Sequence, residues 1–160
     1  MTTTAARTVP QPGTVTTTVD RAAPRPGPVT TTVTEPYWKY AADGELWIQR
    51  CEDCGRCQHY PAVMCRSCWS EHLDWIRAAG TGTVWTFTVV SKPGHLAWEQ
   101  DTPYVLALVE LDEGPRMMTN IIDCDPATVH VGQRVQLAPH TRASGQPPLQ
   151  FHPHNSLPRS

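Results

Sequence analysis

Five of the six cysteines fall within residues 46–69. Four of them form two C-x2-C pairs, and ten residues separate one pair from the other. The four are Cys51, Cys54, Cys65 and Cys68. Each pair closes a tight turn that brings two thiolates together, and two pairs supply the ligands of one tetrahedral metal ion. The spacing predicts a zinc ribbon with one zinc ion, which is structural because four protein ligands leave no open coordination position.

A fifth cysteine leaves the register of ligands open. Cys57 forms another C-x2-C pair with Cys54, so spacing alone does not fix which thiols bind the metal. We favour the first four cysteines because they give two symmetric turns, and Gly55 supplies the positive φ that the first turn needs. Cys57 is then a spare thiol. The alternative to a metal is a pair of disulfides, which a reducing compartment disfavours.

Length and composition bound the class of protein. With 160 residues, 18% charged residues and a formal net charge of −2, the chain suits one small globular unit or two minor ones. No apolar run approaches the roughly 20 residues of a membrane-spanning helix. The N-terminus also lacks the charged and hydrophobic regions of a signal peptide. We therefore expect a cytoplasmic protein with reduced cysteines.

Residues 1–34 differ in composition from the rest of the chain. They are rich in Thr, Pro, Ala and Val, contain no aromatic residue, and repeat PGTVTTTV (12–19) as PGPVTTTV (26–33). Such a segment has too little apolar surface to form a core, so we expect a disordered leader.

The rest of the chain is expected to divide into a helix and zinc ribbon over 35–72, a barrel over 73–153 and a tail over 154–160.

The periodicity after the leader predicts a mainly β protein. Thr34 and Pro36 are typical of a helix start, and Gly44 of its end. Strands are expected at 46–50, 73–78, 83–90, 104–111, 116–122, 135–137 and 149–151. In the strand at 83–90, Trp85, Phe87 and Val89 share one face, and Trp85 and Phe87 are expected in the barrel core. About five short strands after the ribbon, separated by short turns, predict a small barrel of the OB type.

The order of motifs resembles a known family. The chain carries R-C-x2-C-G, C-x2-C, G-x-G, T-x-T-V-V, P-Y, L-V-E-L-x-E-G-P-R, N-x-x-D-C-D-P and G-x-x-V in that order. From about Glu35 to Phe151 this is similar to the acyl-CoA-associated zinc-ribbon and OB-fold family, domain of unknown function 35. The resemblance implies a rubredoxin-like ribbon and an accessory subunit of a thiolase-fold enzyme (thiolase, aldolase or acyltransferase) acting on acyl-CoA. The alternative that it implies is a subunit of a MaoC-like enoyl-CoA hydratase.

The residues themselves offer no self-sufficient active site. Cys57 lies beside the predicted metal, and Asp123 and Asp125 flank Cys124, which raises the pKa of a thiol. The seven histidines are scattered and form no H-E-x-x-H pair. We therefore expect that the chain is not an enzyme by itself.

Binding of single-stranded nucleic acid is a further alternative, because both OB barrels and zinc ribbons serve it. Outside residues 1–34, however, ten Lys and Arg face fourteen Asp and Glu, a formal charge of −4. Binding to a phosphate backbone needs a basic surface instead. The sequence therefore disfavours this function.

Large aromatic and basic side chains are the candidates for contact with a partner or with CoA at a shared interface. The candidates are Tyr37, Trp38, Trp69, Lys92, His95, Trp98 and Arg116. Aromatic side chains fill interface pockets at low entropic cost, although each of these could equally serve the protein's own core. The basic residues Arg66, Arg77, Arg134 and Arg142 could also meet a CoA phosphate, but single arginines are more often solvated surface.

Overall fold

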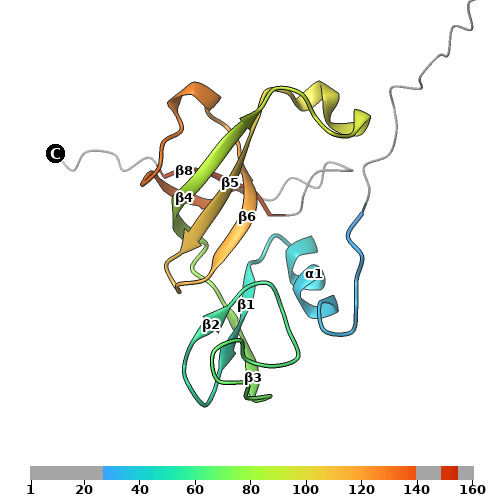
Figure 1. Cartoon of the computed structure of the whole chain (residues 1–160), viewed down its shortest axis with the longest axis vertical. Helices are drawn as coiled ribbons and strands as arrows, with labels where there is room; N and C mark the ends of the chain where they lie inside the picture. Colours follow the sequence, from blue (N-terminus) through green and yellow to red (C-terminus); the bar gives the residue numbers. More distant parts are fainter. Residues whose placement is uncertain (1–26, 140–148, 155–160) are drawn as a thin grey trace, which may run out of the picture.

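The structure, a computed structural model, describes residues 27–139 and 149–154 (Figure 1). It has one short helix, a small sheet and a barrel. The small sheet contains β1 (Trp47–Cys51), β2 (Cys57–Gln58) and β3 (Leu73–Arg77). The barrel contains β4 (Thr81–Val90), β5 (Tyr104–Leu111), β6 (Arg116–Ile121), β7 (Arg134–Leu137) and β8 (Phe151–Pro153). The mainly β class with a helix, a ribbon and a closed OB-like barrel confirms the predicted fold.

The helix α1 (Glu35–Ala42) begins directly after Thr34, as predicted. The Thr34 side chain does not cap it, because its Oγ1 accepts from the backbone N–H of Thr31 at 2.9 Å. Gly44, at φ 79°, follows the end of the helix. Tyr37 is buried and makes an edge-on contact with Tyr60, with ring centroids 5.4 Å apart. The aromatic face of α1 therefore packs against the loop that follows β2.

The small sheet has the order β2-β1-β3, with all neighbours antiparallel. Residues 73–78 were expected in the barrel, but β3 pairs with β1 over five residues, from Trp47 opposite Arg77 to Cys51 opposite Leu73. This strand belongs to the ribbon because the second cysteine turn returns the chain beside β1. The N–H of Ala78 then donates to the carbonyl of Leu46 at 2.9 Å, immediately before the barrel begins.

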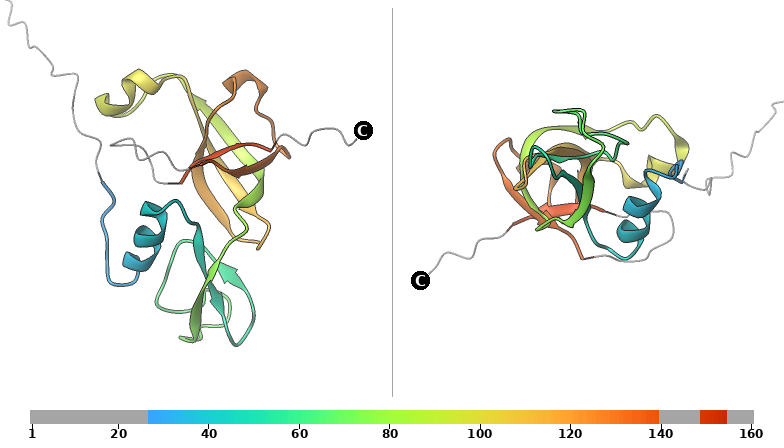
Figure 2. Two further views of the ribbon diagram at one scale, coloured as in Figure 1. Left: turned by 180° about the vertical axis from the view of Figure 1, so that it is seen from behind. Right: turned by 90° about the horizontal axis from the view of Figure 1, so that it is seen from below.

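The barrel is closed in the order β4-β5-β6-β8-β7. Its last strand, β8, lies between β6, to which it is parallel, and β7, to which it is antiparallel. Alternate residues of β5 (Val105, Ala107, Val109 and Leu111) point inward and are buried, as the period of a strand requires. Phe151 of β8 is 0% exposed. Figure 2 shows the barrel and the ribbon as two units joined end to end.

The alternation predicted for β4 is wrong at Trp85, whereas Phe87, opposite the buried Ala107, packs against the core as expected. Trp85 is 50% exposed and Val89 is also exposed, whereas Val84 is buried. The register with β5 shifts between Val84 and Thr86, which marks a β-bulge. A bulge inserts one residue and turns the following side chains to the other face. Trp85 therefore lies on the outside of the barrel, where the Arg116 guanidinium lies 3.4 Å from its ring centroid.

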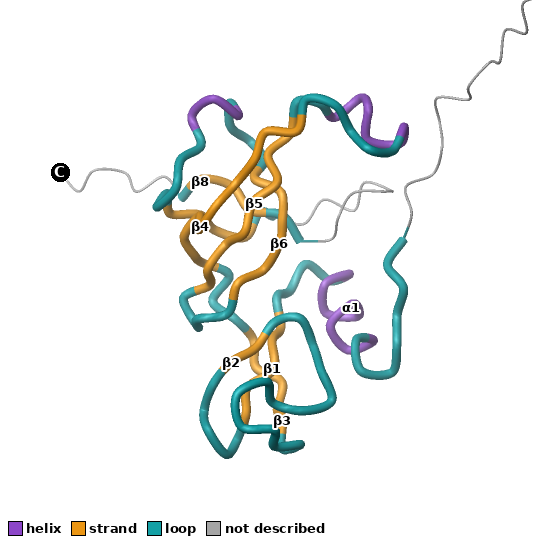
Figure 3. Tube along the Cα trace, in the orientation of Figure 1, coloured by secondary structure: helices purple, strands orange, loops and turns teal. Residues whose placement is uncertain are grey.

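Loops with short 3-10 helices connect the remaining strands (Figure 3). The loop between β4 and β5 contains η1 (Leu96–Asp101), which begins where His95 Nδ1 accepts from the N–H of Ala97. The loop between β6 and β7 contains η2 (Pro126–Thr128). Within the described part of the chain, no helix has the length and apolar character needed to cross a lipid bilayer. Most of the predicted leader (1–26) and tail (155–160) lies outside the described residues.

Candidate metal centre

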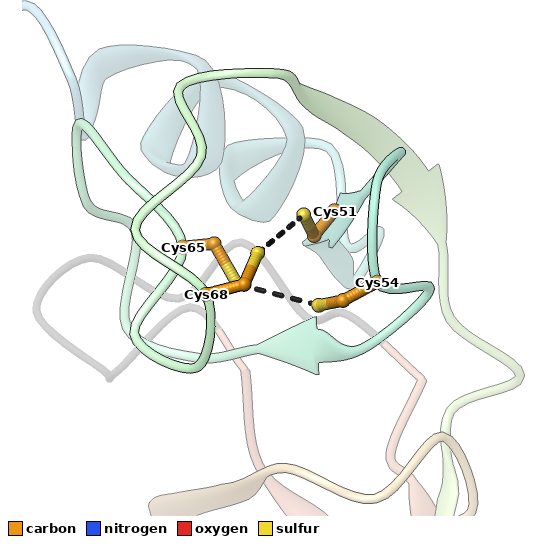
Figure 4. Close-up of side chains that lie close together, drawn as sticks. All are labelled: Cys51, Cys54, Cys65 and Cys68. Atoms are coloured by element: carbon orange, nitrogen blue, oxygen red, sulfur yellow. Dashed lines mark hydrogen bonds between the residues drawn. The ribbon is translucent and has the colours of Figure 1, made fainter.

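The four predicted ligands come together at the end of the ribbon (Figure 4). All four sulfurs lie within 4.8 Å of one another, with 3.5 Å between those of Cys51 and Cys68 and 3.6 Å between those of Cys54 and Cys65. A tetrahedral zinc with Zn–S bonds of about 2.3 Å separates its sulfurs by about 3.8 Å. The donor set therefore fits one structural zinc, as the sequence predicts. Four thiolates complete the coordination sphere and leave no position for water or substrate.

The two cysteine turns share the same backbone geometry. The N–H of Gly55 donates to the carbonyl of Cys51 at 2.9 Å, and the N–H of Trp69 donates to the carbonyl of Cys65 at 2.9 Å. Both donors lie four residues after the first ligand of the pair, and both have a positive φ, 71° for Gly55 and 65° for Trp69. A tryptophan at such a φ is strained where glycine is not. Its side chain is 74% exposed, so the second turn presents an indole to solvent.

Backbone donors favour the thiolate form of Cys65. The N–H of Ser67 lies 3.4 Å from the Cys65 Sγ. Hydrogen bonds from the backbone of Ser67, and next from that of Cys68, lower the pKa of the Cys65 thiol to about 6. A thiolate is the form that binds zinc. The backbone therefore favours the thiolate at Cys65, whereas burial and hydrogen bonds with the other three cysteines raise the pKa of the Cys68 thiol.

Two buried glutamines that were not predicted from the sequence position the second turn. Gln49 and Gln58 are opposite each other on β1 and β2, and Gln58 Nε2 donates to Gln49 Oε1 at 2.9 Å. Gln49 binds both backbone groups of Ala62, accepting from its N–H at 2.9 Å and donating to its carbonyl at 3.1 Å. Gln58 accepts from the N–H of Arg66 at 3.0 Å and donates to the carbonyl of Met64 at 3.3 Å.

Gln58 therefore holds the residues on both sides of the ligand Cys65. The loop that contains Ala62, Met64 and Arg66 is not paired with any of the described strands. The side-chain amides of the two glutamines therefore supply the hydrogen bonds that a neighbouring strand would otherwise make. The only signal in the sequence is that two glutamines occur at strand positions in a cysteine-rich segment. The sequence does not give the register of β1 against β2, which is what brings the two side chains into contact.

The two remaining cysteines are not activated. Cys57 lies in β2 outside the set of four, which settles the register that the spacing left open. Burial is the main cause that raises the pKa of the Cys57 thiol. Burial also raises the pKa of Cys124, and Asp123 and Asp125 add to the effect. A nucleophilic thiol needs the opposite shift.

The candidate contact residues are not gathered in one place. Tyr37 is buried on the ribbon, which leaves little of its ring for a partner. Trp38 is half-buried beside Tyr60, with ring centroids 6.2 Å apart. Trp69 is exposed beside the metal ligands. Arg116 lies at the start of β6, where its Nε donates to Glu110 Oε2 at 2.8 Å.

The other candidates lie in the loop between β4 and β5, at the end of the barrel away from the ribbon (Figure 1). Lys92 and His95 are exposed there, and Trp98 is half-buried with its ring centroid 6.4 Å from that of Tyr104. Trp98 also lines a cavity of about 270 Å³ together with Tyr104 and Cys124.

Comparison with protein families matches the two halves of the chain in order. The family described as "ChsH2, rubredoxin-like zinc ribbon domain" matches residues 38–74. The family described as "ChsH2, C-terminal OB-fold domain" matches residues 75–139. The two matches are consecutive and together cover more than half of the chain.

Three relatives are each similar to part of this chain. The "probable enoyl-CoA hydratase alpha subunit" of Thermomonospora curvata is 42% identical over 102 residues, 63% of this chain and 31% of that protein. A "DUF35 domain-containing scaffold protein" of Pyrococcus furiosus is 30% identical over 102 residues, 63% of this chain and 74% of that protein. The "benzoylsuccinyl-CoA thiolase subunit BbsA" of Geobacter metallireducens is 32% identical over 74 residues, 45% of this chain and 47% of that protein. The chain thus spans about a third of the first relative.

A solved structure extends the likeness to three dimensions. The structure described as "Ltp2-ChsH2(DUF35) aldolase" contains a chain that is 35% identical to this one, with a TM-score of 0.67. The match covers 79% of this chain and 98% of that chain. The zinc ribbon, the OB-like barrel and their order along the chain, together with these matches, show that the protein belongs to the DUF35 family.

Proposed function

We propose that this chain is a non-catalytic accessory subunit that binds and supports a thiolase-fold enzyme acting on acyl-CoA. The observation that carries the proposal is the match to 98% of the similar chain in the Ltp2-ChsH2(DUF35) aldolase. The likeness therefore extends over nearly the whole of a protein that is named as part of an aldolase. The similarity to a thiolase subunit supports the same class of partner.

The chemistry of the described residues supports a non-catalytic role. The zinc site has four protein ligands, so the metal has no place for a substrate. Cys57 and Cys124 both have raised thiol pKa values, which disfavours a covalent mechanism through either. We therefore expect that the purified chain alone turns over no acyl-CoA.

A hydratase partner is the second candidate, and the similarity to the Thermomonospora protein favours it. The match covers only 31% of that protein, so the remaining two thirds could carry the hydratase activity that its name states. Under this alternative the chain would still be an accessory unit, but its enzyme would be a MaoC-like enoyl-CoA hydratase.

Two tryptophans, the exposed Trp69 and the half-buried Trp98, are the proposed contacts with the enzyme. Trp69 presents most of its indole beside the zinc, and Trp98 lies in a loop at the other end of the molecule. Large aromatic side chains at an interface centre commonly contribute more than 2 kcal/mol each to binding. A partner that contacts both would have to extend along the ribbon and the barrel.

Co-expression tests the proposal. The chain is produced with a thiolase-fold candidate or with a MaoC-like hydratase candidate, and each pair is assayed for co-purification and for acyl-CoA turnover. We expect a complex with the thiolase-fold candidate whose activity depends on this chain. Trp69→Ala and Trp98→Ala should each weaken assembly at least tenfold while zinc content stays at one equivalent. Val131→Ala is the matched control, because Val131 is also an exposed apolar residue but is not a proposed contact.

Two outcomes would overturn this function. One is turnover of an acyl-CoA by the isolated chain. The other is failure of both enzyme classes to bind while single-stranded nucleic acid binds. The exposed position of Trp85 makes the second test worthwhile, although the Arg116 side chain already covers one face of that ring.

A further inference from the structure

A cleft of about 370 Å³ lies where the ribbon meets the barrel. Its lining residues are 56–59 and 65–67 of the ribbon and 114–116 of the barrel. The last segment is the β5–β6 turn, which Figure 1 shows at the end of the barrel that faces the ribbon. We call it the ribbon–barrel cleft. Both units must keep their arrangement for the cleft to exist, so it is a feature of the whole chain.

Three arginines line the ribbon–barrel cleft, and no Asp or Glu is among the described residues that line it. They are Arg56, Arg66 and Arg116, and they come from three separate segments of the chain. The whole chain has a formal net charge of −2. The positive charge of three guanidinium groups at one small cleft is therefore unusual in a protein whose net charge is slightly negative.

Contacts orient each arginine without using all its donors. Arg66 Nη2 donates to the carbonyl of Tyr60 at 3.1 Å, and Arg56 Nη1 lies 3.5 Å from Ser67 Oγ. Arg116 is held by Glu110 through Nε and by the face of the Trp85 ring. A guanidinium has five N–H donors, so each group can still bind an anion. An arginine with a fixed plane loses less entropy when it binds.

The zinc centre offers a simpler explanation for part of this charge. Four thiolates and one Zn²⁺ carry a net charge of −2, which nearby cations would stabilise. Arg66 directly follows the ligand Cys65, and Arg56 lies two residues after Cys54. Arg116, however, belongs to the barrel, and its carboxylate partner Glu110 is on the adjacent strand. The metal therefore does not account for Arg116, whose own partners are Glu110 and the Trp85 ring.

We propose that the ribbon–barrel cleft binds the phosphoryl group of a small phosphorylated molecule. Arginine is suited to this ligand because its planar fork donates two parallel hydrogen bonds to phosphate oxygens. The Ser67 hydroxyl also lines the cleft and can donate to a phosphate oxygen. This inference goes beyond the proposed function, because the isolated chain needs no enzyme partner to bind the anion.

Two sources can supply such a group, and the probes distinguish them. Coenzyme A represents a nucleotide that carries phosphoryl groups, and inorganic diphosphate represents the free anion. Each is titrated into the full-length zinc-loaded chain at low ionic strength by isothermal titration calorimetry. If coenzyme A binds more tightly than diphosphate, the natural ligand is a nucleotide. If the two bind equally, the ligand is the free anion. Either result supports a phosphoryl site, and the affinity should fall as salt is added.

Four variants locate the site. Arg56→Gln and Arg116→Gln should each weaken binding about tenfold, which is about 1.4 kcal/mol. Arg77→Gln is the matched control, because Arg77 pairs with Glu45 and does not line the cleft. Glu110→Gln should leave binding unchanged or tighten it, since it removes a carboxylate that competes for Arg116. If the ion pair only stabilises the local structure, Arg116→Gln and Glu110→Gln should instead both weaken binding of the anion.

Zinc retention against a chelator is measured for every variant. The proposal is overturned if neither probe binds, or if Arg77→Gln weakens binding as much as the cleft variants do. It is also overturned if Arg56→Gln and Arg116→Gln lower zinc retention and leave anion binding unchanged, because the arginines would then serve the metal. None of these results bears on whether the chain binds a thiolase-fold enzyme.

Discussion

Replacement of Gln58 by Leu tests whether the glutamine pair holds the metal site in place. Gln58 is 8% exposed, and leucine nearly matches its size. The change removes three hydrogen bonds, those to Gln49, to the carbonyl of Met64 and to the N–H of Arg66. Both backbone groups flank the ligand Cys65, so the second cysteine turn loses its attachment to β2. We expect the metal site to weaken while the barrel is unaffected.

The expected magnitude follows from the hydrogen bonds lost. At about 0.5–1.5 kcal/mol each, three bonds give about 1.5–4.5 kcal/mol. The contacts with Met64 and Arg66 are only part-buried, so water can replace them in part, and we expect about 2 kcal/mol. Because folding of a small zinc site is coupled to metal binding, this loss should raise the apparent Kd for zinc about 30-fold.

Competition with a chromophoric zinc chelator measures that Kd. Gln136→Leu is the matched control, because Gln136 is a part-buried glutamine of β7 that bonds His152 and His154 far from the metal. If Gln58→Leu changes the apparent Kd less than threefold, or if Gln136→Leu changes it as much, the glutamine pair does not position the metal site.

Three further changes test other parts of the structure. Cys65→Ser should bind less than half an equivalent of zinc by metal analysis while Cys57→Ser keeps a full one; the reverse pattern would reassign the ligands. The pKa of His59 is lowered to about 4, chiefly by burial and next by Arg66, so the unfolded chain takes up the proton first. The free energy of unfolding should therefore fall as the pH drops from about 6.5 to about 4, and His59→Phe should flatten that fall in urea titrations; equal slopes would contradict the assignment. Phe151→Ala should lower the free energy of unfolding by about 3–5 kcal/mol without loss of zinc, and a change below 1 kcal/mol would show that β8 does not close the barrel.

The parts of the fold that sequence predicted well depend on local patterns. The metal site was visible because two C-x2-C pairs predict one, and the symmetry of the two turns favoured Cys51, Cys54, Cys65 and Cys68 over Cys57. The helix after Thr34 and the strand 104–111 also match their predicted positions, since proline placement and a run of apolar, β-prone residues act within a few residues.

The parts that sequence missed depend on pairing between distant segments. The bulge at Trp85 is set by the register of β4 against β5, and periodicity within one strand does not contain it. The pairing of β3 with β1 rather than with the barrel was hidden for the same reason. The amides of Gln49 and Gln58 meet only once β1 and β2 are aligned, and the three arginines of the ribbon–barrel cleft meet only once both units are placed.

The position of β8 between β6 and β7 has a consequence for synthesis on the ribosome. All strands of the ribbon end by Arg77, whereas the barrel needs Phe151–Pro153 to close. At roughly 5–20 residues per second, about 4–15 s separate the two events. During this interval the ribbon can bind its metal and fold, while the edges of β6 and β7 stay unpaired. Unpaired edges can add a foreign strand. A chaperone or a nascent partner that covers these edges should therefore raise the yield of folded protein, and depletion of zinc should act at an earlier stage than damage to the last strand.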